Sequence, residues 1–306
     1  MNTGRTSGAW ARFRLGAKGA AFLFSVLIVA IWIAYSLQFK QSHVISVATA
    51  GAEITFSRNL TSHWRVPRAT LCARRENRLR TGAVEETVER ACDPVLFEEL
   101  DLSEVEITFA KDARLLFDAT SETGTLDILF LADNAPGAVR VNDLTPRPGS
   151  ILKVPADAWR AAGSFAFTGR IAIGEVASSG VGRIVLSGRY EIREPQVFGT
   201  STVSVKSGDF FSGDRIRIVD DSGEASAEVT GFFISEDKVM RFQVVSPLGR
   251  NHLRVDRLGS APSIISSNVI DRSLSDPWLL FLSLLPAIAL TVLQLFAAIA
   301  PGRREP

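Results

Sequence analysis

The sequence predicts a mainly β protein, in which an antiparallel β-sandwich or barrel-like domain lies between two transmembrane α-helices. Three observations lead to this fold class. The middle of the chain alternates apolar and polar residues with a period of two, which is typical of strands with one buried face. Clusters of Gly, Pro, Asp and Asn separate the alternating stretches. Both ends of the chain contain long runs without a charged residue.

The N-terminal end begins with a basic segment and continues as an uncharged run. Residues 1–18 contain Arg and Lys but no acidic residue, and we expect them to form a cytoplasmic tail. Residues 19–38 are predicted to form the first transmembrane helix, because basic residues precede it as the positive-inside rule requires. The alternative is a signal peptide cleaved after the small residues at 48–50, but these lie far beyond the usual cleavage distance.

Residues 41–272 are predicted to form the extracytoplasmic, β-rich part. The run 214–220 shows the strand pattern, because Ile216 and Ile218 share one face while Arg215 and Arg217 share the other. A composition change suggests two lobes, 41–195 and 196–272, although one continuous sandwich explains the pattern equally well. Further strands are expected over 52–58, 64–71, 104–109, 113–118, 126–131, 137–141, 164–175, 183–193, 202–206, 226–234, 238–246 and 252–257.

Helical signals in the middle are few. The stretch 82–100 is rich in Glu, Ala and Val and predicts one or two short helices, and 155–163 predicts another that begins near a proline. Residues 258–276 are rich in Ser and Pro and are expected to form a tether toward the membrane.

The C-terminal end contains the second uncharged run. Residues 277–300 are predicted to form the second transmembrane helix, because the 23 residues from 278 to 300 are uncharged and span about 34 Å as a helix, which is enough to cross a bilayer. The arginines of the tail 301–306 are expected to stay in the cytoplasm. The expected localisation is therefore the inner membrane, with both termini cytoplasmic and residues 41–272 periplasmic.

Candidate helix–helix contacts within the membrane are Ala30, Ala34 and Gln294.

The chain has two cysteines, Cys72 and Cys92, both in the predicted exported part. Oxidising compartments favour disulfides, so these two are expected to pair, and two buried free thiols are the alternative. Closing a loop of that length stabilises the folded state by about 3 kcal/mol in the chain-entropy model. The three histidines and two cysteines show no metal-ligand spacing, and no metal or cofactor is expected.

The densest charge feature is a basic cluster followed by an acidic stretch. The functional interpretation is a patch that binds an anionic polymer, lipid headgroup or acidic partner, since guanidinium groups suit carboxylates and phosphates. The alternative is that the basic and acidic halves pair within the chain. The patch consists of Arg65, Arg68, Arg74, Arg75, Arg78 and Arg80.

The chain lacks the sequence signatures of common catalytic sites, including Gly-x-Ser-x-Gly, His-Glu-x-x-His and glycine-rich phosphate loops. The predicted exported part contains 27 Lys and Arg against 31 Asp and Glu, a net charge of about −4, which disfavours nucleic acid as a partner. The leading hypothesis is a noncatalytic scaffold or accessory protein of the bacterial cell envelope that binds an envelope protein or polymer, alone or as a homo-oligomer. Two alternatives are an envelope sensor that signals through its spans to a cytoplasmic protein, and an envelope hydrolase that uses a pair of carboxylates.

Overall fold

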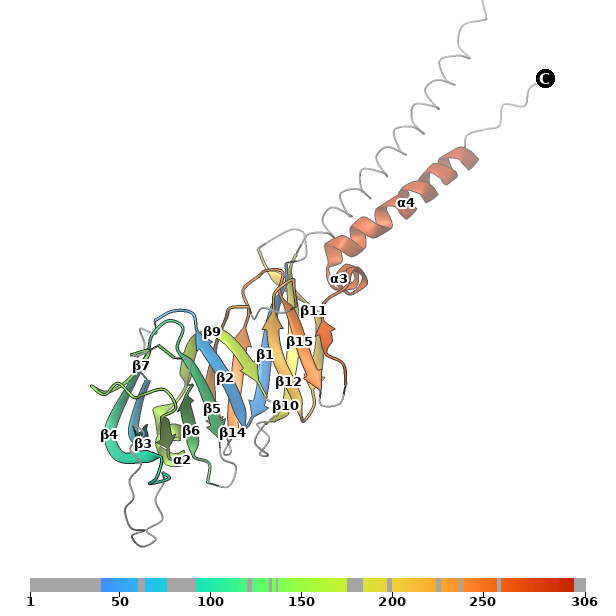
Figure 1. Ribbon diagram of the computed structural model, residues 1–306. Helices are drawn as coiled ribbons and strands as arrows, with labels where there is room; N and C mark the ends of the chain where they lie inside the picture. Colours follow the sequence, from blue (N-terminus) through green and yellow to red (C-terminus); the bar gives the residue numbers. More distant parts are fainter. Residues whose placement is uncertain are drawn as a thin grey trace, which may run out of the picture. The chain divides into compact units, whose positions relative to one another are not determined.

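The structure is a computed structural model, and most of its described residues lie in one large antiparallel sheet (Figure 1). The predicted β-rich class is therefore confirmed. The chain divides into two compact units. Unit 1 comprises 1–40, 194–205 and 267–306, and unit 2 comprises 41–193 and 206–266. The structure describes residues 40–59, 64–75, 92–119, 123–131, 134–135, 137–174, 184–196, 200–223, 227–236, 239–257 and 260–299.

Within the described residues, the strands follow the alternating stretches of the sequence, and three helices accompany them. In chain order the elements are β1 (Ser42–Thr49), β2 (Gly51–Phe56), β3 (Trp64–Arg74), β4 (Phe97–Phe109), β5 (Arg114–Ala119), β6 (Leu126–Phe130), β7 (Val139–Val141), β8 (Ile151–Val154), α2 (Ala156–Ala162), β9 (Phe165–Ile173), β10 (Val185–Pro195), β11 (Thr202–Phe210), β12 (Asp214–Val219), β13 (Val229–Glu236), β14 (Val239–Val245), β15 (His252–Arg257), β16 (Ser263–Ile265), α3 (Val269–Ser275) and α4 (Pro277–Ile299).

The sheet has a main path and one branch. Along the path the order is β11-β10-β1-β14-β13-β9-β2-β5-β6-β8-β3-β4-β7. The branch begins at β9, whose first half pairs with β13 and whose end pairs with β12. β12 pairs in turn with β15, and β15 pairs with β16. The branch therefore brings β12 and β2 to the same end of β9, on either side of it.

The sheet folds back on itself around an aromatic core. Five strands separate β13 from β3 along the path, which corresponds to about 29 Å in a flat sheet. Yet the rings of Phe233 on β13 and Trp64 on β3 lie 6.3 Å apart. Phe165 of β9 and Phe117 of β5 complete the contact, with ring centroids 5.7 Å apart. The two parts of the sheet therefore face each other, which agrees with the predicted sandwich-like arrangement.

Helix α2 confirms the short helix predicted over 155–163. Pro155 precedes its first turn, where a missing backbone N–H costs nothing. The helix packs against β3 and β13 and buries Trp159 completely. Gly163 ends the helix with φ of 72°, a conformation that residues with a Cβ rarely adopt.

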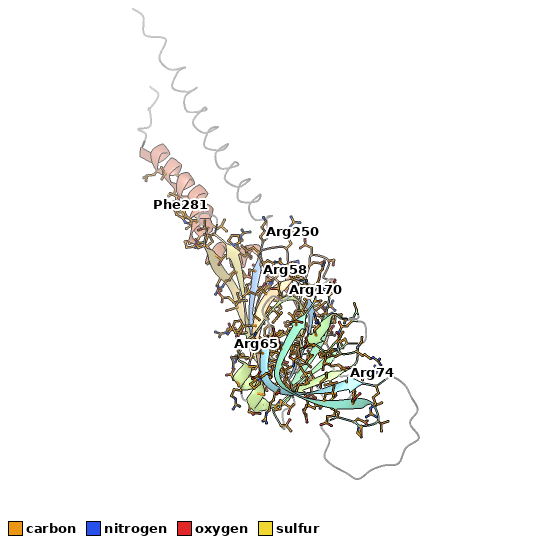
Figure 2. All side chains as sticks on the ribbon, turned by 90° about the vertical axis from the view of Figure 1, so that its left-hand side faces the viewer. Arg58, Arg65, Arg74, Arg170, Arg250 and Phe281 are labelled. Atoms are coloured by element: carbon orange, nitrogen blue, oxygen red, sulfur yellow. A yellow bond between two sulfur atoms is a disulfide. The ribbon has the colours of Figure 1, made fainter. Side chains whose placement is uncertain are left out.

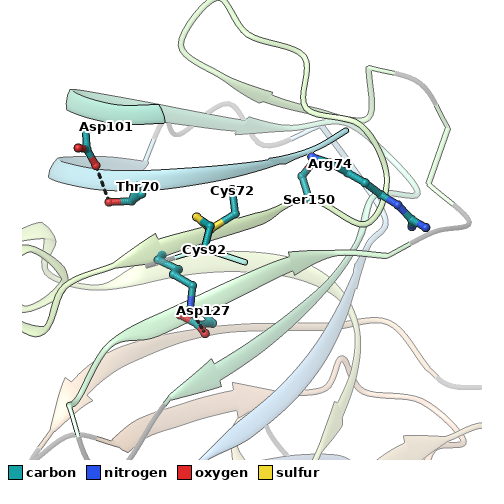
Figure 3. Close-up of a disulfide and its surroundings, with 8 residues drawn as sticks. Thr70, Cys72, Arg74, Cys92, Asp101, Asp127 and Ser150 are labelled. Atoms are coloured by element: carbon teal, nitrogen blue, oxygen red, sulfur yellow. Dashed lines mark hydrogen bonds and ion pairs between the residues drawn. A yellow bond between two sulfur atoms is a disulfide. The ribbon is translucent and has the colours of Figure 1, made fainter. Parts of the chain in front are cut away.

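The hairpin of β3 and β4 contains the disulfide. Cys72 on β3 is bonded to Cys92, with the two Cα atoms 5.7 Å apart, so the predicted pairing is confirmed (Figure 3). The predicted helix over 82–100 is wrong in its last part, because β4 already begins at Phe97. Pairing with β3 outweighs the local helix preference there, since Phe97 lies opposite Arg74 and Glu99 opposite Cys72. The earlier part, 76–91, lies outside the described residues.

Unit 1 contains the end of β10, the start of β11, α3 and α4. Where a tether was expected, α3 follows a capping box in which the Asn268 side chain and Asp271 satisfy each other's backbone N–H groups. α4 covers almost the whole of the second uncharged run. None of the helices in the described part of the chain qualifies as a membrane-crossing helix by length and hydropathy together. The two predicted spans therefore gain no support here, and residues 19–38 lie outside the described residues.

Candidate functional site

An open pocket of about 240 Å³ lies on the polar face of the sheet in unit 2. It is formed where β2, β5, β9 and β12 run side by side. Four of its eight lining residues are arginines, and only one is acidic. We call these residues the arginine pocket; they are Glu53, Thr55, Arg114, Arg170, Ile171, Ala172, Arg215 and Arg217.

The alternation of the strands places these arginines on one face. On β12, Ile216 and Ile218 are buried in the core, so the intervening Arg215 and Arg217 project to the other side. Antiparallel register then brings residues from separate strands together. Thr55 of β2 lies between Arg114 of β5 and Arg170 of β9, its partners in the two neighbouring strands.

Acidic side chains balance part of this positive charge. The Nε of Arg114 donates a hydrogen bond to the Glu53 carboxylate at 3.2 Å. Arg217 donates to Asp256 on β15 at 2.8 Å, and Arg254 donates to the same carboxylate at 2.8 Å. Burial raises the pKa of Asp256, but hydrogen bonds and charge from the two arginines outweigh it, so the pKa is lowered. Asp256 therefore stays ionised while it is shared by two guanidinium groups.

Arg170 is not neutralised in this way. Arg170 is exposed and forms no ion pair with any residue in the described part of the chain. The lining contains four guanidinium groups and one carboxylate, which gives a formal charge of +3.

The predicted basic patch lies elsewhere, on the β3–β4 hairpin. Arg65 is 3.8 Å from Glu106 of β4, and Arg68 donates to Asp157 of α2 at 2.7 Å. The hydrogen bond from Arg68 lowers the pKa of Asp157. Both arginines are largely exposed, and exposed pairs of this kind contribute little stability.

The other described members of the predicted patch, Arg74 and Arg75, do not line the arginine pocket. Arg74 and Arg75 are exposed at the end of β3, and Arg78 and Arg80 lie outside the described residues. Figure 2 shows Arg65 and Arg74 well separated from Arg170. The role of this patch as a site stays a prediction.

The predicted contacts in the membrane stay a prediction. Ala30 and Ala34 lie outside the described residues, and Gln294 is exposed on α4. Among the residues that the structure describes, no three His, Cys, Asp or Glu side chains are grouped so that they could hold a metal ion.

A second polar group is buried around His43 on β1. His43 is fully buried, and its Nδ1 is 3.5 Å from the Ser246 hydroxyl, which accepts the His43 backbone N–H at 2.9 Å. The Nε2 of His43 has no hydrogen-bond partner within the described residues. Burial and the charge of nearby His252 lower the pKa of His43 to about 4. The imidazole is therefore neutral in the folded protein at pH 7.

Acidification is expected to destabilise unit 2 through His43. Its pKa is 6.5 in a model peptide and about 4 when folded, so the unfolded chain binds the proton first as the pH falls. The free energy of unfolding should therefore fall between pH 6.5 and pH 4, by about 3 kcal/mol in total. Urea denaturation of the wild type and of His43→Gln at pH 7, 5.5 and 4 measures this contribution.

The matched control is His252→Gln, since His252 is partly exposed and lies 3.6 Å from the Asp221 carboxylate. His43→Gln should flatten the pH dependence, and His252→Gln should change it much less. Parallel stability profiles for the wild type and His43→Gln would show that another group causes the acid sensitivity.

Sequence reasoning missed the arginine pocket, although one signal for it was present. The alternation in 214–220 places Arg215 and Arg217 on one face. Arg114 and Arg170 are distant in sequence, and only strand pairing brings them to the same place.

No protein-family model matches this chain, and neither a curated protein nor a solved structure matches it. The functional argument therefore rests on the residues and their geometry.

Proposed function

We propose that this protein is a noncatalytic scaffold or accessory protein of the bacterial cell envelope. Segments 19–38 and 277–300 hold it in the inner membrane, with both termini in the cytoplasm. The β-rich unit 2 lies in the periplasm and binds an envelope protein or polymer. The Cys72–Cys92 bond supports this compartment, because structural disulfides persist in oxidising environments.

The arginine pocket is the observation that carries the binding role. It combines four cations held on strands with a single carboxylate, which is an arrangement for recognition rather than for acid–base chemistry. Strands hold side chains more precisely than loops do, so the pocket is formed before any partner arrives.

Topology is tested with two reporter fusions. A reporter active only in the periplasm is fused after Ser260, and one active only in the cytoplasm is fused after Pro306. Both fusions should be active. In the matched control, residues 278–299 are deleted, and the reporter after position 306 should then lose its cytoplasmic activity. Cytoplasmic activity of a reporter at Ser260 would contradict the proposed compartment.

Binding is tested by site-specific photo-crosslinking in intact cells. A photoreactive residue at Thr55, in the arginine pocket, should form adducts with an envelope component. The same residue at Arg68, on the β3–β4 hairpin, is the matched control and should not form these adducts. Adducts of equal yield and size from both positions would contradict a binding role for the pocket.

A further inference from the structure

We infer that the arginine pocket binds a phosphate group, either as free phosphate or as the phosphate of an ester. This inference rests on the proposed function in one respect, because it names the chemical class of the partner that unit 2 recognises.

The charge of the pocket favours an anion. Four guanidinium groups face one carboxylate within the lining, and Arg114 already uses that carboxylate, Glu53. The lining carries a formal charge of +3, and Arg254 and Asp256 beside it add one charge of each sign. Like charges held close together on rigid strands repel each other, and a bound anion relieves that repulsion.

Two guanidinium groups of the pocket, those of Arg170 and Arg217, have donors without an acceptor among the described residues. Arg170 forms no ion pair with the described residues, so its guanidinium is available to a ligand. The Nε of Arg217 is buried and has no acceptor within the described part of the chain, although the other end of that guanidinium bonds to Asp256. A buried donor without an acceptor is unfavourable, and an oxyanion in the pocket supplies acceptors.

The number of donors distinguishes phosphate from carboxylate. A carboxylate has two acceptor oxygens and one negative charge, and one arginine fork can bind both oxygens. A phosphate monoester has three acceptor oxygens. Like a phosphorylated side chain, it carries a charge of roughly −1.5 to −2 at pH 7. It can therefore accept from several guanidinium groups at once, which matches arginines that come from three different strands.

The size and lining of the pocket limit the rest of the ligand. At about 240 Å³ it lies below the range of roughly 300–1,000 Å³ that is typical of sites for whole drug-sized molecules. It therefore takes a phosphate with a small attached group and leaves the remainder outside. The lining contains no aromatic side chain on which a base could stack, so it does not favour a nucleic acid.

The test is calorimetric titration of the full-length chain in a phosphate-free, uncharged detergent. The probes are inorganic phosphate, glucose 1-phosphate, glucuronate and glucose. Phosphate or its ester should bind, glucuronate should bind at least about tenfold more weakly, and glucose should not bind. Stronger binding of the ester than of inorganic phosphate would identify an ester as the ligand, and the reverse would identify free phosphate. Binding should also weaken as the salt concentration rises.

Two variants probe the pocket, and one variant serves as the control. Arg170→Gln and Arg217→Gln should each weaken phosphate binding about tenfold, since each removes a charge-assisted hydrogen bond. Arg65→Gln removes an exposed arginine of unit 2 outside the pocket and should leave binding unchanged. Arg170 is exposed, so its variant should melt at the wild-type temperature, which separates lost binding from lost folding.

Three results would overturn the inference. These are no binding of either phosphate probe at millimolar concentration, equal affinity for glucuronate and phosphate, and equal weakening by Arg65→Gln and Arg170→Gln. Because titration uses purified protein, its outcome does not depend on topology. A failed titration with correct reporter topology rejects the phosphate ligand alone, whereas failed reporters reject the proposed compartment.

Discussion

Replacing Arg272 with methionine is expected to lower the free energy of unfolding of unit 1 by about 3–5 kcal/mol. Arg272 of α3 and Glu194 of β10 are each at most 2% exposed, and their Nε and Oε2 atoms lie 3.0 Å apart. The Ser267 hydroxyl donates a hydrogen bond to the other oxygen of the same carboxylate. Removing the arginine leaves a buried negative charge with no cation to compensate it.

Urea denaturation of the full-length chain measures the effect, and two controls make it specific. Arg193→Met removes the arginine that precedes Glu194 in the chain. Arg193 forms an exposed pair with Glu191 at 2.9 Å, so this variant should change the free energy of unfolding by no more than about 0.5 kcal/mol. The double variant Glu194→Gln with Arg272→Met removes both charges and should recover most of the loss. If Arg272→Met were no more destabilising than Arg193→Met, the buried pair would not hold α3 to β10.

Replacing Phe233 with alanine is expected to cost about 3–5 kcal/mol of the stability of unit 2. Phe233 is fully buried, and its removal leaves a cavity at the centre of the aromatic core. The ring centroids of five aromatic side chains lie between 5.0 and 6.4 Å from that of Phe233, namely Trp64, Phe117, Trp159, Phe165 and Phe242. The loss comes from both burial and ring–ring contacts.

Phe232→Ala is the matched control for this variant. Phe232 precedes Phe233 on β13, points to the opposite face and is 39% exposed. Chemical denaturation followed by near-ultraviolet circular dichroism should show a large loss for Phe233→Ala and a loss of less than about 1 kcal/mol for Phe232→Ala. Equal losses would show that the aromatic core is not the main source of stability.

Most strands were predictable because their pattern is local. β5, β6, β9, β13, β14 and β15 begin or end within three residues of their predicted bounds. β1 was not predicted, because its buried residues include Ser42, His43 and Thr49, which read as polar positions. Their burial depends on hydrogen bonds to residues far along the chain, such as the bond from the Ser42 hydroxyl to the Ser246 carbonyl. The residues around Ser42 in the sequence do not indicate a partner so far along the chain.

The candidate site was predictable only in its chemistry. Arginine-rich recognition of an anion was expected, but it was assigned to a cluster that is contiguous in sequence, between Arg65 and Arg80. In the structure Arg65 and Arg68 face acidic partners. The arginine pocket instead assembles residues as far apart as Glu53 and Arg217.

The sequence by itself determined the β-rich class, the positions of most strands, the short helix at α2 and the Cys72–Cys92 pair. The strands and the helix follow from alternation and turn residues, which are local patterns of a few residues. The disulfide follows from the count of cysteines, because two cysteines leave only one possible pair. Only the tertiary structure decided the branch at β9, the arginine pocket and the Glu194–Arg272 pair. Each of these depends on which strand edges meet, and backbone hydrogen bonding between strands is nearly the same for every side chain. The choice of neighbour is therefore made by packing and charge across the whole sheet.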